Sequence, residues 1–212
     1  MPLSRPVDRF RDLRSSLNGD GLYGRVLAGS CLALITLAAG GEPVRRALRY
    51  ERSAIAAGQW WRLITGHCVH LGLEHAVLNC LGLGLLWALF ARDYSPRGWL
   101  VILGASVAAI DFGLWLGAST ILWYVGSSGV LHGLMAAGTL ASLRRGEASG
   151  WLLAAFLIAK LIYEQLHGAL PFDRGMPVVV DAHLYGALGG AAGALLWGLA
   201  GRRVQDRDPK PV

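Results

Sequence analysis

The 212-residue chain is 54% hydrophobic and only 16% charged, with a mean hydropathy of +0.44. This composition is far more apolar than that of a soluble domain of similar length, and it indicates a protein with several membrane spans. The net charge of +6 does not indicate nucleic-acid binding, because the arginines flank apolar runs and form no basic face with interleaved aromatic residues.

Six apolar runs are long enough to cross the roughly 30 Å hydrocarbon core of a bilayer. In lipid each run must be a helix, because a helix satisfies its own backbone hydrogen bonds. The runs fall at residues 24–41, 68–90, 97–117, 127–143, 150–168 and 178–200. The sequence therefore predicts an all-α polytopic membrane protein, with a six-helix core at 25–200, a basic N-terminal segment at 1–24 and a C-terminal tail at 201–212.

The charge distribution predicts the direction of the spans. Six spans place both termini on one side, and the segments on that side hold thirteen of the 20 Lys and Arg residues, against six in the opposite segments. The positive-inside rule then places both termini in the cytoplasm. As an alternative, the first run is a signal peptide with a cleavage site near Ala38, but its basic leader of about 25 residues is long for that role.

In this topology the second, fourth and sixth runs all begin in the outer leaflet. Their first halves carry His75 and Asn79, Ser128 and His132, and His183. Polar residues are costly inside a bilayer and are functional candidates there. Three separate spans thus deliver polar groups to the same depth.

Ser128 lies in the stretch "GSSG", residues 126–129, where a loop enters the fourth run. At a helix N-terminus the backbone N–H groups are free to cap the helix or to bind a developing oxyanion. Taken alone, this stretch is typical of a serine cap followed by a packing motif.

Small residues on two runs favour a nucleophilic role for Ser128. They recur every four residues, as Gly129 and Gly133 in the fourth run and as Ala182, Gly186 and Gly190 in the sixth. Such spacing lets membrane helices approach closely. Packing of the two rows would bring Ser128 and His183 within hydrogen-bond reach, as a serine nucleophile and its base require.

These motifs resemble those of the rhomboid family of intramembrane serine proteases. The matching features are "GSSG" at 126–129, "AHLYGALGG" at 182–190, the pair Trp61–Arg62 before the second run, and His75 with Asn79 within it. The resemblance covers about residues 25–200 and implies a six-helix rhomboid-like bundle.

The resemblance also implies roles for individual residues. Ser128 would attack a peptide carbonyl, and His183 would take its proton and return it to the leaving amine, without a third carboxylate. His75, Asn79 and the Ser128 backbone N–H would stabilise the oxyanion. No metal and no cofactor is expected.

His132 indicates a branch of the family. Many bacterial rhomboids carry an aromatic residue four positions after the nucleophile, stacked on the catalytic imidazole, whereas this chain has histidine. With Leu131, the pattern G-x-S-G-x-L-H-G resembles rhombosortase, which implies membrane-anchored substrates with a C-terminal tag of a Gly-Gly motif, an apolar span and a basic tail. The site would open to the periplasmic side of a bacterial inner membrane. A general rhomboid protease of single-span proteins is the alternative.

The fifth run carries a polar stripe of Lys160, Tyr163, Glu164 and His167, spaced along one helical face. Lys160 and Glu164 are spaced for an ion pair, which is less costly in lipid than either charge alone. We expect the outer part of the stripe, together with His132, to bind substrate or to gate its access.

Two further features lie near the predicted site. Asp111 is a charge within the third run, and Lys160 is one option for its partner. The loop 168–179 contains two prolines and precedes the sixth run, so it is positioned to cap the site.

Other classes of protein remain open. His67, His70 and His75 are an alternative zinc site, although they lack the H-E-x-x-H pattern. A non-enzymatic rhomboid-like binding protein is a second alternative, which the presence of both Ser128 and His183 disfavours. A small transporter is a third, without an evident inverted repeat.

Overall fold

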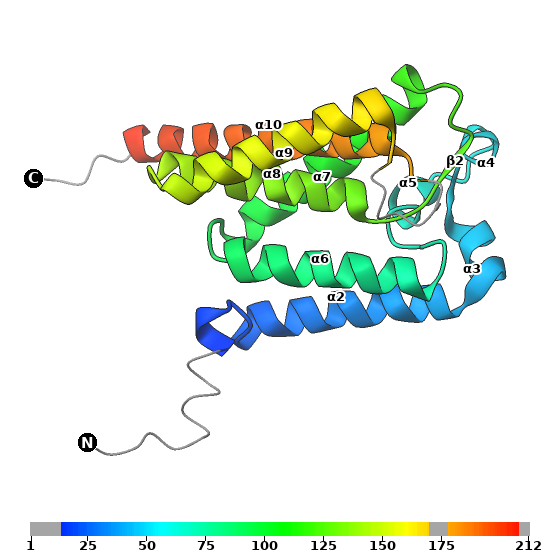
Figure 1. The fold of residues 1–212 in the computed structure, drawn as a ribbon, viewed down its shortest axis with the longest axis horizontal. Helices are drawn as coiled ribbons and strands as arrows, with labels where there is room; N and C mark the ends of the chain where they lie inside the picture. The colour runs from blue at the N-terminus through cyan, green and yellow to red at the C-terminus, as the bar shows by residue number, and fades with distance from the viewer. Residues whose placement is uncertain (1–13, 170–177, 208–212) are drawn as a thin grey trace, which may run out of the picture.

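The computed structural model describes residues 14–169 and 178–207, with side chains described as far as residue 200. Within these residues six long helices lie side by side as a bundle (Figure 1). They are α2 (Gly21–Ala39), α6 (Leu73–Phe90), α7 (Pro96–Phe112), α8 (Ser128–Arg144), α9 (Ala148–His167) and α10 (Val180–Arg207). The start of α2 and the end of α10 lie at the same end of the bundle, as the predicted topology requires.

Four helical segments have the length and apolar composition of membrane spans: α2, α6, α7 with the π-helix that extends it, and α9. The predicted helical class of the protein is therefore confirmed, and the apolar helices fit a membrane protein. Helices α8 and α10 form where the fourth and sixth runs predicted them, and their crossing of the bilayer stays a prediction.

The second predicted span begins earlier than the helix observed, whereas the third agrees with it. The second was expected from residue 68, but α6 begins at Leu73 because turns occupy the residues before it. The third predicted span, 97–117, agrees with α7 and the π-helix η1 (Gly113–Gly117) that extends it. A side chain at Gly113 would meet the Tyr185 ring at 2.2 Å, so the glycines of η1 give that ring its space.

We call the end where α6, α8 and α10 begin the site end. Short helices and strands that the sequence did not predict cover this end. They are α3 (Gly41–Leu48), β1 (Tyr50–Glu51), α4 (Arg52–Ala56), α5 (Arg62–Thr65) and β2 (Trp123–Tyr124). Strands β1 and β2 pair antiparallel, with Tyr50 opposite Tyr124. Two residues after β2, the N–H of Gly126 donates to the carbonyl of Gly66. These bonds hold the segment that leads into α8.

Arg62, in the pair that the sequence singled out, is buried within this cover. Its guanidinium donates to the carbonyls of Arg46 and Arg49 and to the side chain of Gln59 at 2.7–2.9 Å. Its neighbours Trp60 and Trp61 are exposed, as aromatic residues at a membrane interface commonly are. Arg62 therefore joins the start of α5 to the end of α3.

Helix α10 packs most extensively on α8 and α7. A Cβ added at Gly186 would lie 2.0 Å from the carbonyl oxygen of Gly129, and one at Gly190 would lie 2.1 Å from that of Gly133. The backbones of α8 and α10 are therefore in contact, as the small-residue pattern predicted.

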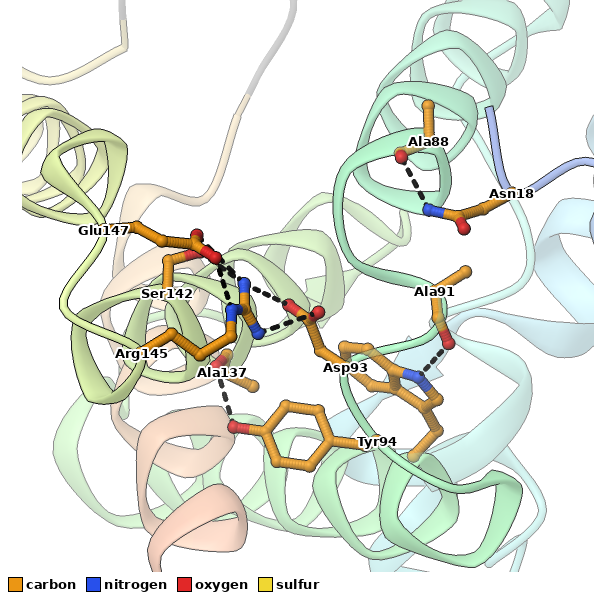
Figure 2. A network of polar contacts seen from close by, with 10 residues as sticks. Asn18, Ala88, Ala91, Asp93, Tyr94, Ala137, Ser142, Arg145 and Glu147 are labelled. Atoms are coloured by element: carbon orange, nitrogen blue, oxygen red, sulfur yellow. Dashed lines mark hydrogen bonds and ion pairs between the residues drawn. The ribbon is translucent and has the colours of Figure 1, made fainter. Parts of the chain in front are cut away.

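A network of polar groups joins two loops at the opposite end (Figure 2). Arg145, after α8, bonds Asp93 in the α6–α7 loop at 3.0 Å and also bonds Glu147 and Ser142. The bond from Arg145 lowers the pKa of Glu147, whereas burial raises the pKa of Asp93 despite its arginine partner. We call this set the Arg145 network.

Candidate active site

Ser128 and His183 lie in direct contact at the site end. Ser128 is the first residue of α8, as its sequence context predicted, and His183 is buried in the first turn of α10. The Ser128 Oγ lies 3.0 Å from the His183 Nε2. The helices approach closely beside them, since a Cβ added at Gly129 would lie 2.7 Å from the carbonyl oxygen of Ala182. The predicted packing therefore brings the hydroxyl and imidazole together.

The second nitrogen of His183 contacts a carboxylate. Its Nδ1 lies 3.0 Å from Oε2 of Glu164, which projects from α9 and is 1% exposed. The other carboxylate oxygen of Glu164 pairs with Lys160, one turn earlier on the same helix. The predicted Lys160–Glu164 ion pair is thus present, while the contact between Glu164 and His183 was missed. The signal available was depth, because Glu164 falls in the outer half of its predicted span, as His183 does.

His132 lies one helical turn after Ser128 and stacks on the catalytic candidate His183. The two rings are 4.1 Å apart with planes 16° from parallel. Its Nδ1 is 2.8 Å from the carbonyl oxygen of Ser128 and must carry the proton, because a carbonyl only accepts. Histidine therefore occupies the stacking position that the resemblance assigned to an aromatic residue.

His75 and Asn79 share the first half of α6. The amide of buried Asn79 donates to the backbone carbonyl of His75 at 2.9 Å and retains a second N–H for another acceptor. The His75 ring lies against Gly126, where an added Cβ would be 3.0 Å from the ring and where φ is 114°. Glycine at this position thus lets the ring approach the segment that precedes Ser128.

His67 and His70 have protein partners that sequence reasoning missed. His67 Nε2 is 3.2 Å from Asp111 Oδ1, so Asp111 pairs with His67 and not with Lys160, the option raised from the sequence. His70 Nε2 lies 3.3 Å from Ser127 Oγ, beside the nucleophile candidate. Burial, followed by the nearby His75, lowers the pKa of His70 to about 4, so this ring stays neutral at physiological pH.

One group of three potential metal ligands occurs within the described ranges, namely His132, Glu164 and His183, with ligand atoms within 4.8 Å of one another. The two imidazoles stack almost in parallel, so their nitrogen lone pairs, which lie in the ring planes, do not converge on one point. Glu164 is also paired with Lys160. The donor set fits a chain of hydrogen bonds better than a metal centre.

The polar stripe of α9 divides into two pairs with different surroundings. Glu164 contacts His183 and pairs with Lys160, whereas Tyr163 and His167 stack on each other at 4.7 Å and are both exposed. The buried position of Glu164 favours a role beside His183 over the expected contact with substrate. The predicted cap at 168–179 lies mostly outside the described residues.

The structure thus has a serine–histidine pair inside a bundle of apolar membrane helices, which is the class of site found in intramembrane serine hydrolases. Residues 57–199 match the rhomboid domain. The chain belongs to the rhomboid family of intramembrane serine proteases, and it is a multi-pass membrane protein.

Two curated relatives come from Bacillus subtilis (strain 168). The chain is 27% identical over 136 residues to the "Putative rhomboid protease YdcA", and the aligned region covers 64% of this chain and 66% of that protein. It is 35% identical over 92 residues to the "Rhomboid protease GluP", and the aligned region covers 41% of this chain and 17% of that protein. The chain thus spans less than two thirds of either relative.

Proposed function

We propose that the protein is an intramembrane serine endopeptidase that cleaves membrane-anchored proteins with Ser128 as nucleophile and His183 as general base. One observation carries this proposal, the 3.0 Å contact between Ser128 Oγ and His183 Nε2 within the bundle. A hydroxyl is a weak nucleophile unless a base accepts its proton, and this geometry provides that base.

In the proposed reaction the Ser128 Oγ attacks the peptide carbonyl carbon while His183 accepts the hydroxyl proton. The tetrahedral oxyanion is stabilised by the Ser128 backbone N–H, by the free amide N–H of Asn79 and by His75. His183 then gives the proton to the leaving amine, and water hydrolyses the acyl-enzyme. Loss of one oxyanion donor is expected to lower kcat by about 100- to 1000-fold.

The substrate class we propose is that of rhombosortase: a C-terminal tag with a Gly-Gly motif, an apolar span and a basic tail. Leu131 and His132 support this branch, and the stack of His132 on His183 gives the distinguishing residue a place at the site. The exposed pair of Tyr163 and His167 is the candidate contact for the substrate backbone. Cleavage of single-span proteins without such a tag is the second candidate.

The proposed location is a bacterial inner membrane, with both termini cytoplasmic and the site opening to the periplasmic side. The bundle supports this orientation, because α2 begins and α10 ends at one end (Figure 1), where Arg92, Arg144 and Arg145 also lie. In this arrangement the core at 25–200 joins cytoplasmic segments at 1–24 and 201–212.

The test uses purified protein in lipid with two model substrates that share one apolar span and one basic tail, only one of which has the Gly-Gly motif. We expect wild type to cleave near the glycines, as read by intact mass, and Ser128→Ala and His183→Ala to be inactive. The matched control is Ser149→Ala, an exposed serine near the start of α9, which is expected to retain full activity.

Each outcome of this experiment decides one question. Equal cleavage of both substrates would favour the general rhomboid activity over the tag-specific one. Activity in Ser128→Ala equal to wild type, or inactivity of wild type on both substrates, would reject the protease proposal. Tyr163→Phe and His167→Ala are expected to raise KM for the tagged substrate, and unchanged kinetics would remove this pair from the substrate contact.

A further inference from the structure

We propose that Glu164 is a positioning residue for His183, so that the site is a Ser128–His183–Glu164 triad completed by Lys160. This inference rests on the proposed function and departs from the two-residue site that the resemblance implies. It assigns to α9 a part of the catalytic apparatus, in place of the substrate contact expected for Glu164 from the sequence.

The geometry forms a continuous chain of hydrogen bonds. Both links, from Ser128 Oγ to His183 Nε2 and from His183 Nδ1 to Glu164 Oε2, measure 3.0 Å. An ionised carboxylate only accepts hydrogen bonds, so the Nδ1 of His183 must carry the proton. The Nε2 lone pair is then directed at the Ser128 hydroxyl, which is the tautomer that a general base requires.

His132 does not provide this function. Its ring stacks on the face of His183, and its Nδ1 bonds the carbonyl oxygen of Ser128. Stacking fixes the plane of the catalytic ring but leaves open which nitrogen carries the proton. The contact with Glu164 determines both the tautomer and the rotation of the ring within that plane.

Lys160 explains how a carboxylate persists at this depth. Glu164 is 1% exposed, and an unpaired carboxylate is very costly to bury. The two oxygens of Glu164 divide their partners, with Oε1 on the Lys160 ammonium and Oε2 on His183. The anion therefore has charged or polar partners on both oxygens, and it faces the imidazolium that forms when Ser128 is deprotonated.

Glu164→Gln is the first test. The Lys160 ammonium only donates, so it will bind the amide oxygen and leave the amide NH₂ directed at His183, which favours the wrong tautomer. We expect kcat to fall about 100-fold or more, by analogy with the loss of about 10⁴ for the corresponding change in other serine proteases, and KM to stay within about threefold. The acid limb of the pH–rate profile is expected to move to lower pH, because the imidazolium loses its carboxylate partner.

A matched pair of double variants distinguishes a role of Glu164 in orienting His183 from a role only in neutralising the charge of Lys160. Lys160→Met/Glu164→Gln and Lys160→Met/Glu164→Leu both remove the ion pair, but only the glutamine can turn its oxygen to accept from the Nδ1–H of His183. We expect the Gln double variant to recover at least tenfold in kcat over Glu164→Gln, and the Leu double variant to stay as slow. Ile162→Ala, a lipid-facing change on α9, is the control with unchanged kcat.

If Glu164 serves only as the counter-ion of Lys160, both double variants will match wild type, and the inference fails. It also fails if Glu164→Gln keeps its kcat within threefold and its pH profile unchanged. Ser128→Ala separates these outcomes from failure of the proposed function, because it is inactive whenever the protease proposal holds. Thermal unfolding of each variant in the same detergent verifies that the compared proteins are folded.

Discussion

Two charged networks at opposite ends of the bundle use similar groups in different surroundings. At the site end Lys160 and Glu164 are 18% and 1% exposed, whereas Arg145 and Glu147 in the Arg145 network are each 43% exposed (Figure 2). Water can replace a lost partner at Arg145 and Glu147, so the ion pair between them contributes little. In the buried network a lost partner leaves a polar group unsatisfied. Substitutions in the buried network at the site end are therefore expected to cost more than substitutions in the Arg145 network.

The largest effect is expected from the helix contact that supports the buried network. Gly190→Ala places a Cβ 2.1 Å from the Gly133 carbonyl oxygen and forces α8 and α10 apart, at a cost of about 1–3 kcal/mol or more. We expect a lower Tm in detergent and loss of cleavage. Gly84→Ala, where nothing lies within 4 Å, is the control and should keep both. A Gly190→Ala protein with wild-type activity would show that the helix contact does not set the distance between Ser128 and His183.

An intermediate effect is expected at the stack of His132 on His183, the proposed general base. Aromatic pairs contribute about 0.5–1.5 kcal/mol, which corresponds to roughly 2- to 10-fold in rate if the stack holds the reactive orientation. His132→Ala should therefore lower kcat by that factor, and His132→Phe should restore most of it. Equal kcat for wild type and His132→Ala would mean that the hydrogen bonds of His183 suffice to orient it.

The smallest effect is expected in the Arg145 network. Arg145→Met removes its bonds to Asp93 and Glu147. Glu147 stays exposed to water and Asp93, which is 14% exposed, keeps partial access to it, so the free energy of unfolding should change by about 1 kcal/mol. Cleavage rates should match wild type. A loss of stability as large as that of Gly190→Ala would remove the contrast between the two ends.

The sequence predicted the features that depend on composition and on local spacing. Apolar runs located the long helices, the glycine rows predicted the contact of α8 with α10, and polar depth selected Ser128 and His183. Spacing alone also predicted the Lys160–Glu164 ion pair, because both residues lie on one helix.

Side-chain contacts between separate helices could not be predicted from local spacing in the sequence. The bonds from Glu164 to His183 and from His67 to Asp111 depend on how each helix is rotated about its axis. Rotation is set by packing against neighbours, and the sequence pattern of one helix leaves it open. The short elements β1 and β2 have two residues each, too few for a recognisable period, so the sequence did not predict the cover of the site end.

The backbone contact between α8 and α10 bears on how the protein responds to its lipid surroundings. Bilayers of different thickness make membrane helices tilt. The carbonyl oxygens of two successive glycine turns of α8 lie against the glycines of α10, so the two helices should tilt as one body. Ser128 and His183 then keep their separation when the bilayer thins or thickens. The rate of cleavage should then depend on lipid chain length through substrate access and α9, while the reactive pair itself stays unchanged.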